Sequence, residues 1–236
     1  MAPRRRAIIT ITTAFALVLL TLLPGPGRGQ ARLAVDVAIV LAVDCSYSVD
    51  GEEFRLQMDG LAEAFRSQDV QSAILAGPNG RVAITLVQWS GSRSQEVAVP
   101  WMVVASTSDA NFLANRIATA PRRTAEGATS LTGAIDVGVV LHLKSPIDAT
   151  RRVIDISSDG YNNSGAKPEQ ARNRAISIGL TINGLTILTE YWYLHHYFRN
   201  HIIGGPGSFV LKAEDYSAYR EAIRRKLVLE IMGPTV

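Results

Sequence analysis

Cysteine is almost absent from this chain of 236 residues, whose only thiol is Cys45. A single cysteine excludes an internal disulfide, so the apolar core has to hold the fold together. Any case for export therefore depends on the N-terminal sequence and not on cystine content.

The chain also has little excess charge once its first 31 residues are set aside. Those residues contain four arginines and no acid, so the remainder carries 20 basic and 21 acidic side chains and a net charge of about −1. No stripe of Lys and Arg with interleaved aromatics remains, which excludes a nucleic-acid-binding role. The remaining residues, about 205, suffice for one well-buried domain, which we place at 32–236.

The N-terminal segment has the layout of a secretory signal peptide. Three arginines at 4–6 precede an uncharged apolar run at 7–23, and a stretch rich in Pro and Gly follows. A membrane span needs about 20 apolar residues, and this run is slightly shorter. We therefore favour cleavage, after Gly29 or Ala31, over an anchor retained in the inner membrane, and we expect a periplasmic or extracellular protein.

Apolar runs rich in Val and Ile alternate with segments of helical period through the rest of the chain. This pattern predicts an α/β fold of the Rossmann-like type, with a mostly parallel central sheet and helices on both faces. Nearly continuous apolar runs predict central strands at 35–43, 82–89, 152–156 and 181–188. Edge strands are expected at 96–103, which contains Pro100, and at 208–211. Helical spacing predicts helices at 52–66, 109–119, 131–143, 168–178, 191–202 and 216–232.

Oxygen-bearing side chains gather at three points beside these elements. The segments are Asp44-Cys45-Ser46-Tyr47-Ser48 after the first strand, Gly127-Ala128-Thr129-Ser130 before a helix, and Ser157-Ser158-Asp159-Gly160 after another strand. Loops at the carboxyl ends of parallel strands converge, and a cation such as Mg²⁺ prefers about six oxygen ligands, some of them water. The alternative is that Ser46 or Ser48 caps the next helix and Asp44 offsets its dipole.

The three segments supply D-x-S-x-S, a threonine and an aspartate in that order along the chain. In this respect they resemble the metal-ion-dependent adhesion site of the von Willebrand factor A domain. The resemblance covers nearly the whole chain after residue 31. The segment 153–163 is also similar to a bacterial family of exported A-domain-like proteins of unassigned function.

The resemblance implies a role for each residue of the three segments. Ser46 and Ser48 would ligate the metal through their hydroxyls, and Thr129 would ligate it directly or through water. Asp44 and Asp159 would act mostly through water. One further coordination position would be filled by an acidic side chain of a protein partner.

Three functions follow as alternatives. The first is a non-enzymatic interaction module that binds Mg²⁺, or Mn²⁺ or Ca²⁺, and through it an acidic group of a protein partner. The second is a metal-assisted hydrolase or phosphatase, although aspartyl-nucleophile phosphatases need a second acid where Ser46 stands, and no hydrolase or P-loop motif appears. The third is a metal-free structural A domain whose site oxygens hydrogen-bond one another.

Two residues near the motifs are interpreted as structural. Asp155 falls inside a predicted buried strand, and about 13 Å of strand separates it from Asp159, so it should be paired elsewhere in the core. Cys45 should point away from the proposed metal and remain a buried, unreactive thiol.

The remaining candidates are in the last third of the chain. The spacing of His195, His196 and His201 is not the i, i+4 spacing that places two ligands on one helix face, so zinc is not favoured. The aromatic segment 191–198 is expected to pack into the core in preference to forming a partner surface. The glycines of 204–207 are expected to form a turn and not a phosphate cradle.

Overall fold

The computed structural model describes residues 33–233, which fold around one six-stranded sheet. The strand order is β3-β2-β1-β4-β5-β6, and every neighbouring pair is parallel except β2 and β3. The strands are β1 (Ala34–Asp44), β2 (Val82–Trp89), β3 (Gln95–Val104), β4 (Asp148–Ser158), β5 (Thr181–Ile187) and β6 (Val210–Ala213). The mostly parallel sheet confirms the predicted fold class. The predicted signal segment, 1–31, lies outside the described residues.

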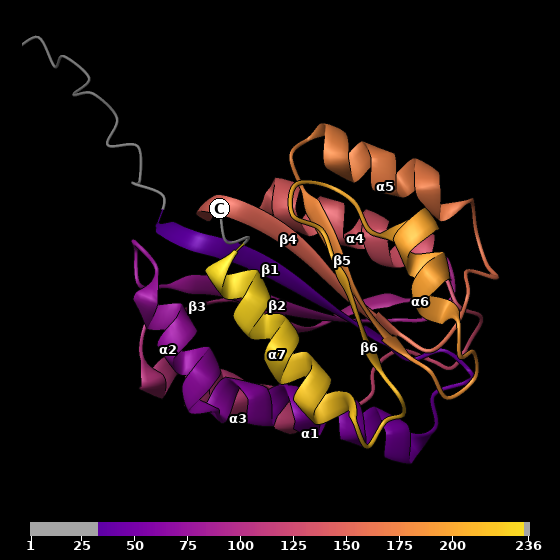
Figure 1. Cartoon of the computed structure of the whole chain (residues 1–236), viewed down its shortest axis with the longest axis horizontal. Helices are drawn as coiled ribbons and strands as arrows, with labels where there is room; N and C mark the ends of the chain where they lie inside the picture. The colour runs from indigo at the N-terminus through magenta and orange to yellow at the C-terminus, as the bar shows by residue number, and fades with distance from the viewer. Residues whose placement is uncertain (1–32, 234–236) are drawn as a thin grey trace, which may run out of the picture. The chain divides into compact units, whose positions relative to one another are not determined.

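Helices cover both faces of this sheet (Figure 1). They are α1 (Gly51–Arg66), α2 (Gln68–Ala76), α3 (Thr107–Ala118), α4 (Leu131–Lys144), α5 (Pro168–Ser177), α6 (Leu194–Tyr197), the π-helix η1 (Phe198–Ile202) and α7 (Tyr219–Met232). The larger apolar core lies between the sheet and α1, α2, α3 and α7, and a second core lies between the sheet and α4, α5, α6 and η1. Residues 33–233 contain no helix with the length and apolarity that crossing a membrane requires.

The central strands form because their residues can be buried on both sides. In β2 all eight residues are buried, and in β1 all but the first are. Such strands read as continuous apolar runs, which is why the sequence predicts them well. The two predicted edge strands do form the edges of the sheet, and Pro100 is exposed in β3.

Several predicted boundaries are wrong for identifiable reasons. The sequence prediction misses α2. Ser67 is both the C-cap of α1 and the N-cap of α2, so helical spacing indicates that the helix ends there and gives no sign that a second one begins. Strand β4 begins four residues earlier than expected, through mostly polar residues that are exposed or only partly buried. Strand β6 is shifted towards Ala213, and α7 begins at Tyr219 after a turn that includes Tyr216.

The predicted helix at 191–202 is shorter and less regular than expected. Regular helix begins only at Leu194, and the second half is a π-helix from Phe198 to Ile202. Single-turn π-helices accommodate an extra residue within a helix, and apolar periodicity does not predict them.

Candidate metal centre

The two acidic residues of the predicted site leave neighbouring strands at the same edge of the sheet. Asp44 is the last residue of β1, and Asp159 directly follows β4. These strands are parallel and adjacent, with Val43 opposite Ser157. Side chains that are 115 positions apart in sequence are therefore brought together at the carboxyl ends of the two central strands.

Hydrogen bonds join the first and third motifs into one network. Ser48 Oγ donates to Asp159 Oδ1 at 2.8 Å, and the hydroxyl oxygens of Ser46 and Ser48 are 3.3 Å apart. The backbone N–H of Ser46 donates to Asp44 Oδ1 at 2.8 Å, while Ser158 Oγ donates to the other oxygen of that carboxylate. The hydroxyls of the D-x-S-x-S segment thus face the aspartate from β4.

Neither serine of the first motif caps the following helix. The N-cap of α1 is Asp50, whose Oδ1 accepts from the N–H groups of Glu52 and Glu53 at 2.8 Å each. Glu53 completes a capping box by accepting from the Asp50 N–H at 2.9 Å. The capping interpretation of Ser46 and Ser48 is therefore wrong, and both hydroxyls lie at the strand end, where a ligand can be bound.

Thr129 lies on the loop before α4 and lines a cavity beside Ser48. A cavity of about 290 Å³ is lined by Ser48, Thr129 and Gly160, among others. Thr129 is held beside the β4 loop because its N–H donates to Asn163 Oδ1 at 2.7 Å and its carbonyl accepts from the Asn163 N–H at 2.9 Å. The structure thus links four of the five predicted residues directly. Thr129 lines a cavity that Ser48 alone of the four also lines, and its hydroxyl makes no hydrogen bond to any of them.

The electrostatics of the two aspartates suit a cation. Asp44 and Asp159 are both fully buried, and neither forms an ion pair with a basic residue of 33–233. Burial, and then the charge of Asp159, raise the pKa of Asp44 to about 7. Burial also raises the pKa of Asp159, although hydrogen bonds from Ser48 and Tyr216 oppose the shift. Two buried like charges are costly in this arrangement unless a proton or a cation offsets them.

The described residues contain no group of three or more His, Cys, Asp or Glu placed to hold one metal ion. A site of the predicted kind has a different donor set, because hydroxyls outnumber carboxylates in it. Hydroxyl and carboxylate oxygens are the donors that hard cations such as Mg²⁺ prefer, so the side chains present fit such an ion.

Three residues of this centre were not predicted. Tyr216 donates from its hydroxyl to Asp159 Oδ2 at 3.1 Å, Ser158 bonds Asp44, and Glu190 lines the cavity. Ser158 is adjacent to a predicted residue and could have been included. The sequences around Tyr216 and Glu190 carry no motif, since their approach depends on how α7 and the loop after β5 pack.

Asp155 is paired in the core, as predicted. Lys226 of α7 contacts Asp155 Oδ1 and lies 2.6 Å from Glu230 Oε1, and all three side chains are almost completely buried. Asn183 Nδ2 also donates to Glu230 Oε1 at 2.9 Å. This buried triad of Asp155, Lys226 and Glu230 joins β4 to α7 below the candidate centre.

The predicted environment of Cys45 is confirmed, since its side chain is fully buried. Burial, and then the charge of Asp44, raise the pKa of the thiol to about 12. Among the histidines, His201 Nδ1 lies 2.6 Å from Glu169 Oε1, and the rings of His195 and His196 pack at a tilt with centroids 4.1 Å apart.

The aromatic segment does not pack as expected. Leu194 and Phe198 are buried, but Trp192 is 75% exposed and its neighbours Tyr191 and Tyr193 are exposed as well. The prediction of core packing is therefore wrong for the first three aromatic residues. By contrast, the glycine-rich segment is a turn as predicted, with positive φ at Gly205 and Gly207.

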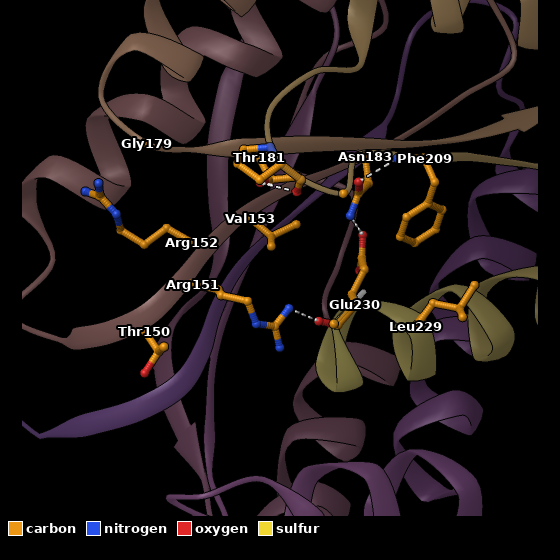
Figure 2. A pocket seen from close by; sticks show the side chains of 13 residues that line it. Thr150, Arg151, Arg152, Val153, Gly179, Thr181, Asn183, Phe209, Leu229 and Glu230 are labelled. Atoms are coloured by element: carbon orange, nitrogen blue, oxygen red, sulfur yellow. Dashed lines mark hydrogen bonds between the residues drawn. The ribbon is translucent and has the colours of Figure 1, made fainter. Parts of the chain in front are cut away.

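A second cavity, of about 310 Å³, lies at the opposite end of β4 and β5 (Figure 2). Its lining includes Arg151, Asn183, Phe209 and Glu230. Arg151 is engaged with the end of α7, because its guanidinium donates to the backbone carbonyl of Glu230 at 2.6 Å. The sequence predicted no site here.

Solved structures with the same fold include several von Willebrand factor A domains. Proximal thread matrix protein 1 from the mussel byssus is 16% identical with a TM-score of 0.62, over 85% of this chain and 49% of that one. A von Willebrand factor type A protein from Catenulispora acidiphila is 15% identical with a TM-score of 0.61, over 86% and 44%. This chain therefore spans about half the length of these two.

Two further findings concern a metal site and a domain of similar size. Another structure of the mussel protein has a MIDAS motif occupied by zinc, at 17% identity and a TM-score of 0.57 over 85% of this chain and 49% of that one. The vWF domain of the type V pili tip protein Mfa5 from Porphyromonas gingivalis is 11% identical with a TM-score of 0.54, over 86% of this chain and 98% of that one.

No curated protein matches the chain. A family model described as "Protein of unknown function (DUF1194)" matches residues 34–235, which is nearly all of the part that the structure describes. The fold, with its sheet order and helices on both faces, is that of the von Willebrand factor A domain. The chain belongs to this family of unknown function, whose fold is here a von Willebrand factor A fold.

Proposed function

We propose that this protein is an exported interaction module that binds a divalent cation and, through it, an acidic side chain of a protein partner. The cation would be Mg²⁺, with Mn²⁺ and Ca²⁺ as alternatives. The observation that carries the proposal is the pair of fully buried carboxylates, Asp44 and Asp159, which are hydrogen-bonded to Ser46 and Ser48 and have no basic partner among residues 33–233. Thr129 lines a cavity beside Ser48.

Each residue has a role that follows from its donor atoms. Ser46 and Ser48 would ligate the ion through hydroxyl oxygen, and Thr129 would do so directly or through water. Asp44 and Asp159 would hold the ion mainly through water and through the serines that they bond. The ion would supply the positive charge that the two carboxylates lack and would attract an acidic group of the partner.

The relatives support the class of function without identifying a partner. The zinc-occupied motif of the mussel protein supports a divalent cation at this end of the sheet, and the pilus-tip and byssus proteins support an extracellular role. Export would agree with the signal-like sequence at 1–31.

An enzymatic function is less well supported by the geometry. Asp44 would be the nucleophile of an aspartyl phosphatase, but its side chain is fully buried and both of its oxygens accept hydrogen bonds from the protein. Ser46 also stands where that mechanism needs a second acid.

Titration calorimetry with Mg²⁺ and Mn²⁺ tests the proposal. We expect the purified protein to bind one ion and the Asp44→Ala variant to lose binding at least 10-fold, because Asp44 supplies charge to the whole centre. Asp59→Ala, which removes an exposed acid of α1, serves as the control and should bind as the wild type does. Absence of binding by the wild type, or unchanged binding by Asp44→Ala, would leave a metal-free domain with internally bonded hydroxyls.

A further inference from the structure

Glu190 brings a third carboxylate to the candidate metal centre. It follows β5 and lines the same cavity as Ser48 and Thr129. Its side chain is exposed, and it makes no hydrogen bond or ion pair with another residue of the described range. Nothing in that range therefore engages the carboxylate, although its backbone lies beside the centre.

Aromatic packing holds this backbone in place. The ring of Tyr191 meets the ring of Tyr161 edge-on, with centroids 4.7 Å apart, and Tyr161 is two residues beyond Asp159. Tyr197 of α6 also meets Tyr161 edge-on, with ring centroids 4.7 Å apart. This cluster ties the loop after β5 to the loop after β4, and it gives the exposed Tyr191 a role. Paired aromatic rings of this kind add stability beyond the area they bury.

The charge of Glu190 acts on the other acids of the centre. Burial is the main cause of the raised pKa of Asp159, and the Glu190 charge adds to it. Glu53, at the start of α1, has its pKa raised first by burial and then by the charges of Asp50, Asp159 and Glu190. The charge of Glu190 thus reaches both Asp159 and Glu53, and the repulsion among these carboxylates favours a cation near them.

We propose that Glu190 is an acidic ligand supplied by the chain itself, which coordinates the bound cation until a partner's carboxylate replaces it. The inference rests on the proposed function. The side chain is not positioned on a common ion with the other acids in this structure, so it has to rotate about its side-chain bonds to reach the ion. An exposed glutamate without bonding partners can do so at little cost.

Two consequences distinguish this role from a general negative field. Removal of the carboxylate weakens cation binding and opens one more position on the ion to water or to another carboxylate. Shortening the side chain to aspartate keeps the charge but removes the reach, so it has the same effect as neutralisation. A residue that acted only through its charge would tolerate this shortening.

Mn²⁺ binding to the purified protein tests the proposal, with water-proton relaxation as a count of the waters on the ion. We expect Glu190→Gln and Glu190→Asp each to weaken Mn²⁺ binding roughly 10-fold and to add about one water. Acetate, the simplest partner carboxylate, should displace that water from Glu190→Gln at lower concentration than it acts on the wild type. Glu126→Gln, which removes an exposed acid next to the cavity-lining Gly127, is the control and should match the wild type.

The results that would overturn this inference differ from those that would overturn the proposed function. If Glu190→Asp behaves as the wild type, or Glu190→Gln behaves as Glu126→Gln, the carboxylate does not reach the ion and this inference is overturned while the metal site stands. If the wild type binds no Mn²⁺ at all, both this inference and the proposed function are overturned.

Discussion

Replacement of Lys226 by methionine should strongly destabilise the fold. The substitution keeps an unbranched side chain that is one heavy atom shorter, and it removes the ammonium group, which lies 2.6 Å from Glu230 Oε1 and contacts Asp155. Both carboxyl groups then remain buried, with exposed fractions of 1% for Asp155 and 2% for Glu230. Breaking a buried ion pair by removing one partner lowers the free energy of unfolding by about 3–5 kcal/mol. This is a large share of the roughly 5–15 kcal/mol that typically stabilises a domain.

This cost should depend on pH in a defined direction. Burial, and then the charge of Asp155, raise the pKa of Glu230 from 4.5 to about 8, although Lys226 opposes the shift. The folded state therefore binds this proton more tightly than the unfolded state, and the contribution of Glu230 to stability falls as pH rises from about 4.5 to 8. Without Lys226 this loss of stability with rising pH is steeper. The Lys226→Met substitution should therefore lower the free energy of unfolding more at pH 8 than at pH 5.

Thermal and urea unfolding followed by circular dichroism measures the effect. The expected loss lowers the melting temperature by roughly 6–20 °C. The triple variant Lys226→Met, Asp155→Asn, Glu230→Gln should recover part of the loss, because replacing a whole buried network is often nearly neutral. Lys212→Met removes an exposed lysine and serves as the control. A Lys226→Met variant within about 1 kcal/mol of the wild type at pH 8 would refute the reasoning.

Three further predictions follow from the described contacts. Cys45, whose pKa burial raises to about 12, should not react with a disulfide reagent at pH 8 until the protein is unfolded, and rapid reaction of the native protein would contradict its burial. Because the folded pKa of Asp44 is raised to about 7, the stability of the metal-free protein should fall as pH rises from about 4 to 7. Mg²⁺ should therefore raise the melting temperature more at pH 8 than at pH 5. Equal shifts at the two pH values would argue against a role for Asp44. Gly205→Ala should lower the free energy of unfolding in urea by about 1–3 kcal/mol, because φ is +93° and the new Cβ would lie 2.6 Å from the Leu180 carbonyl oxygen. Gly51→Ala is the control, since a Cβ there would meet open space. Equal stability of the two variants would contradict the prediction.

The sequence predicted those parts of the fold in which burial alone determines the pattern. Strands β1 and β2 are apolar throughout because both faces are covered, so their positions follow from composition. Helix α2 was missed because only one residue, Ser67, separates it from α1. The polar start of β4 was missed because residues such as Arg151 are only half-buried there.

For the candidate centre, the sequence predicted what the order of strands requires. Asp44 and Asp159 meet because β1 and β4 are adjacent and parallel, a relation implied by the fold class. Glu190 could not be predicted, since its loop reaches the centre through the packing of Tyr191 on Tyr161. Such a contact depends on side-chain geometry and leaves no periodic signal in the sequence.

The two edges of the sheet limit how another protein can attach to it. Strand β6 has only four residues, and β3 carries the exposed Pro100 and pairs with β2 through two shifts of register. A proline and a broken register deprive an incoming strand of a continuous row of backbone donors and acceptors. Sheet extension between copies, and the fibrous aggregation that can follow from it, should therefore be disfavoured even at high protein concentration.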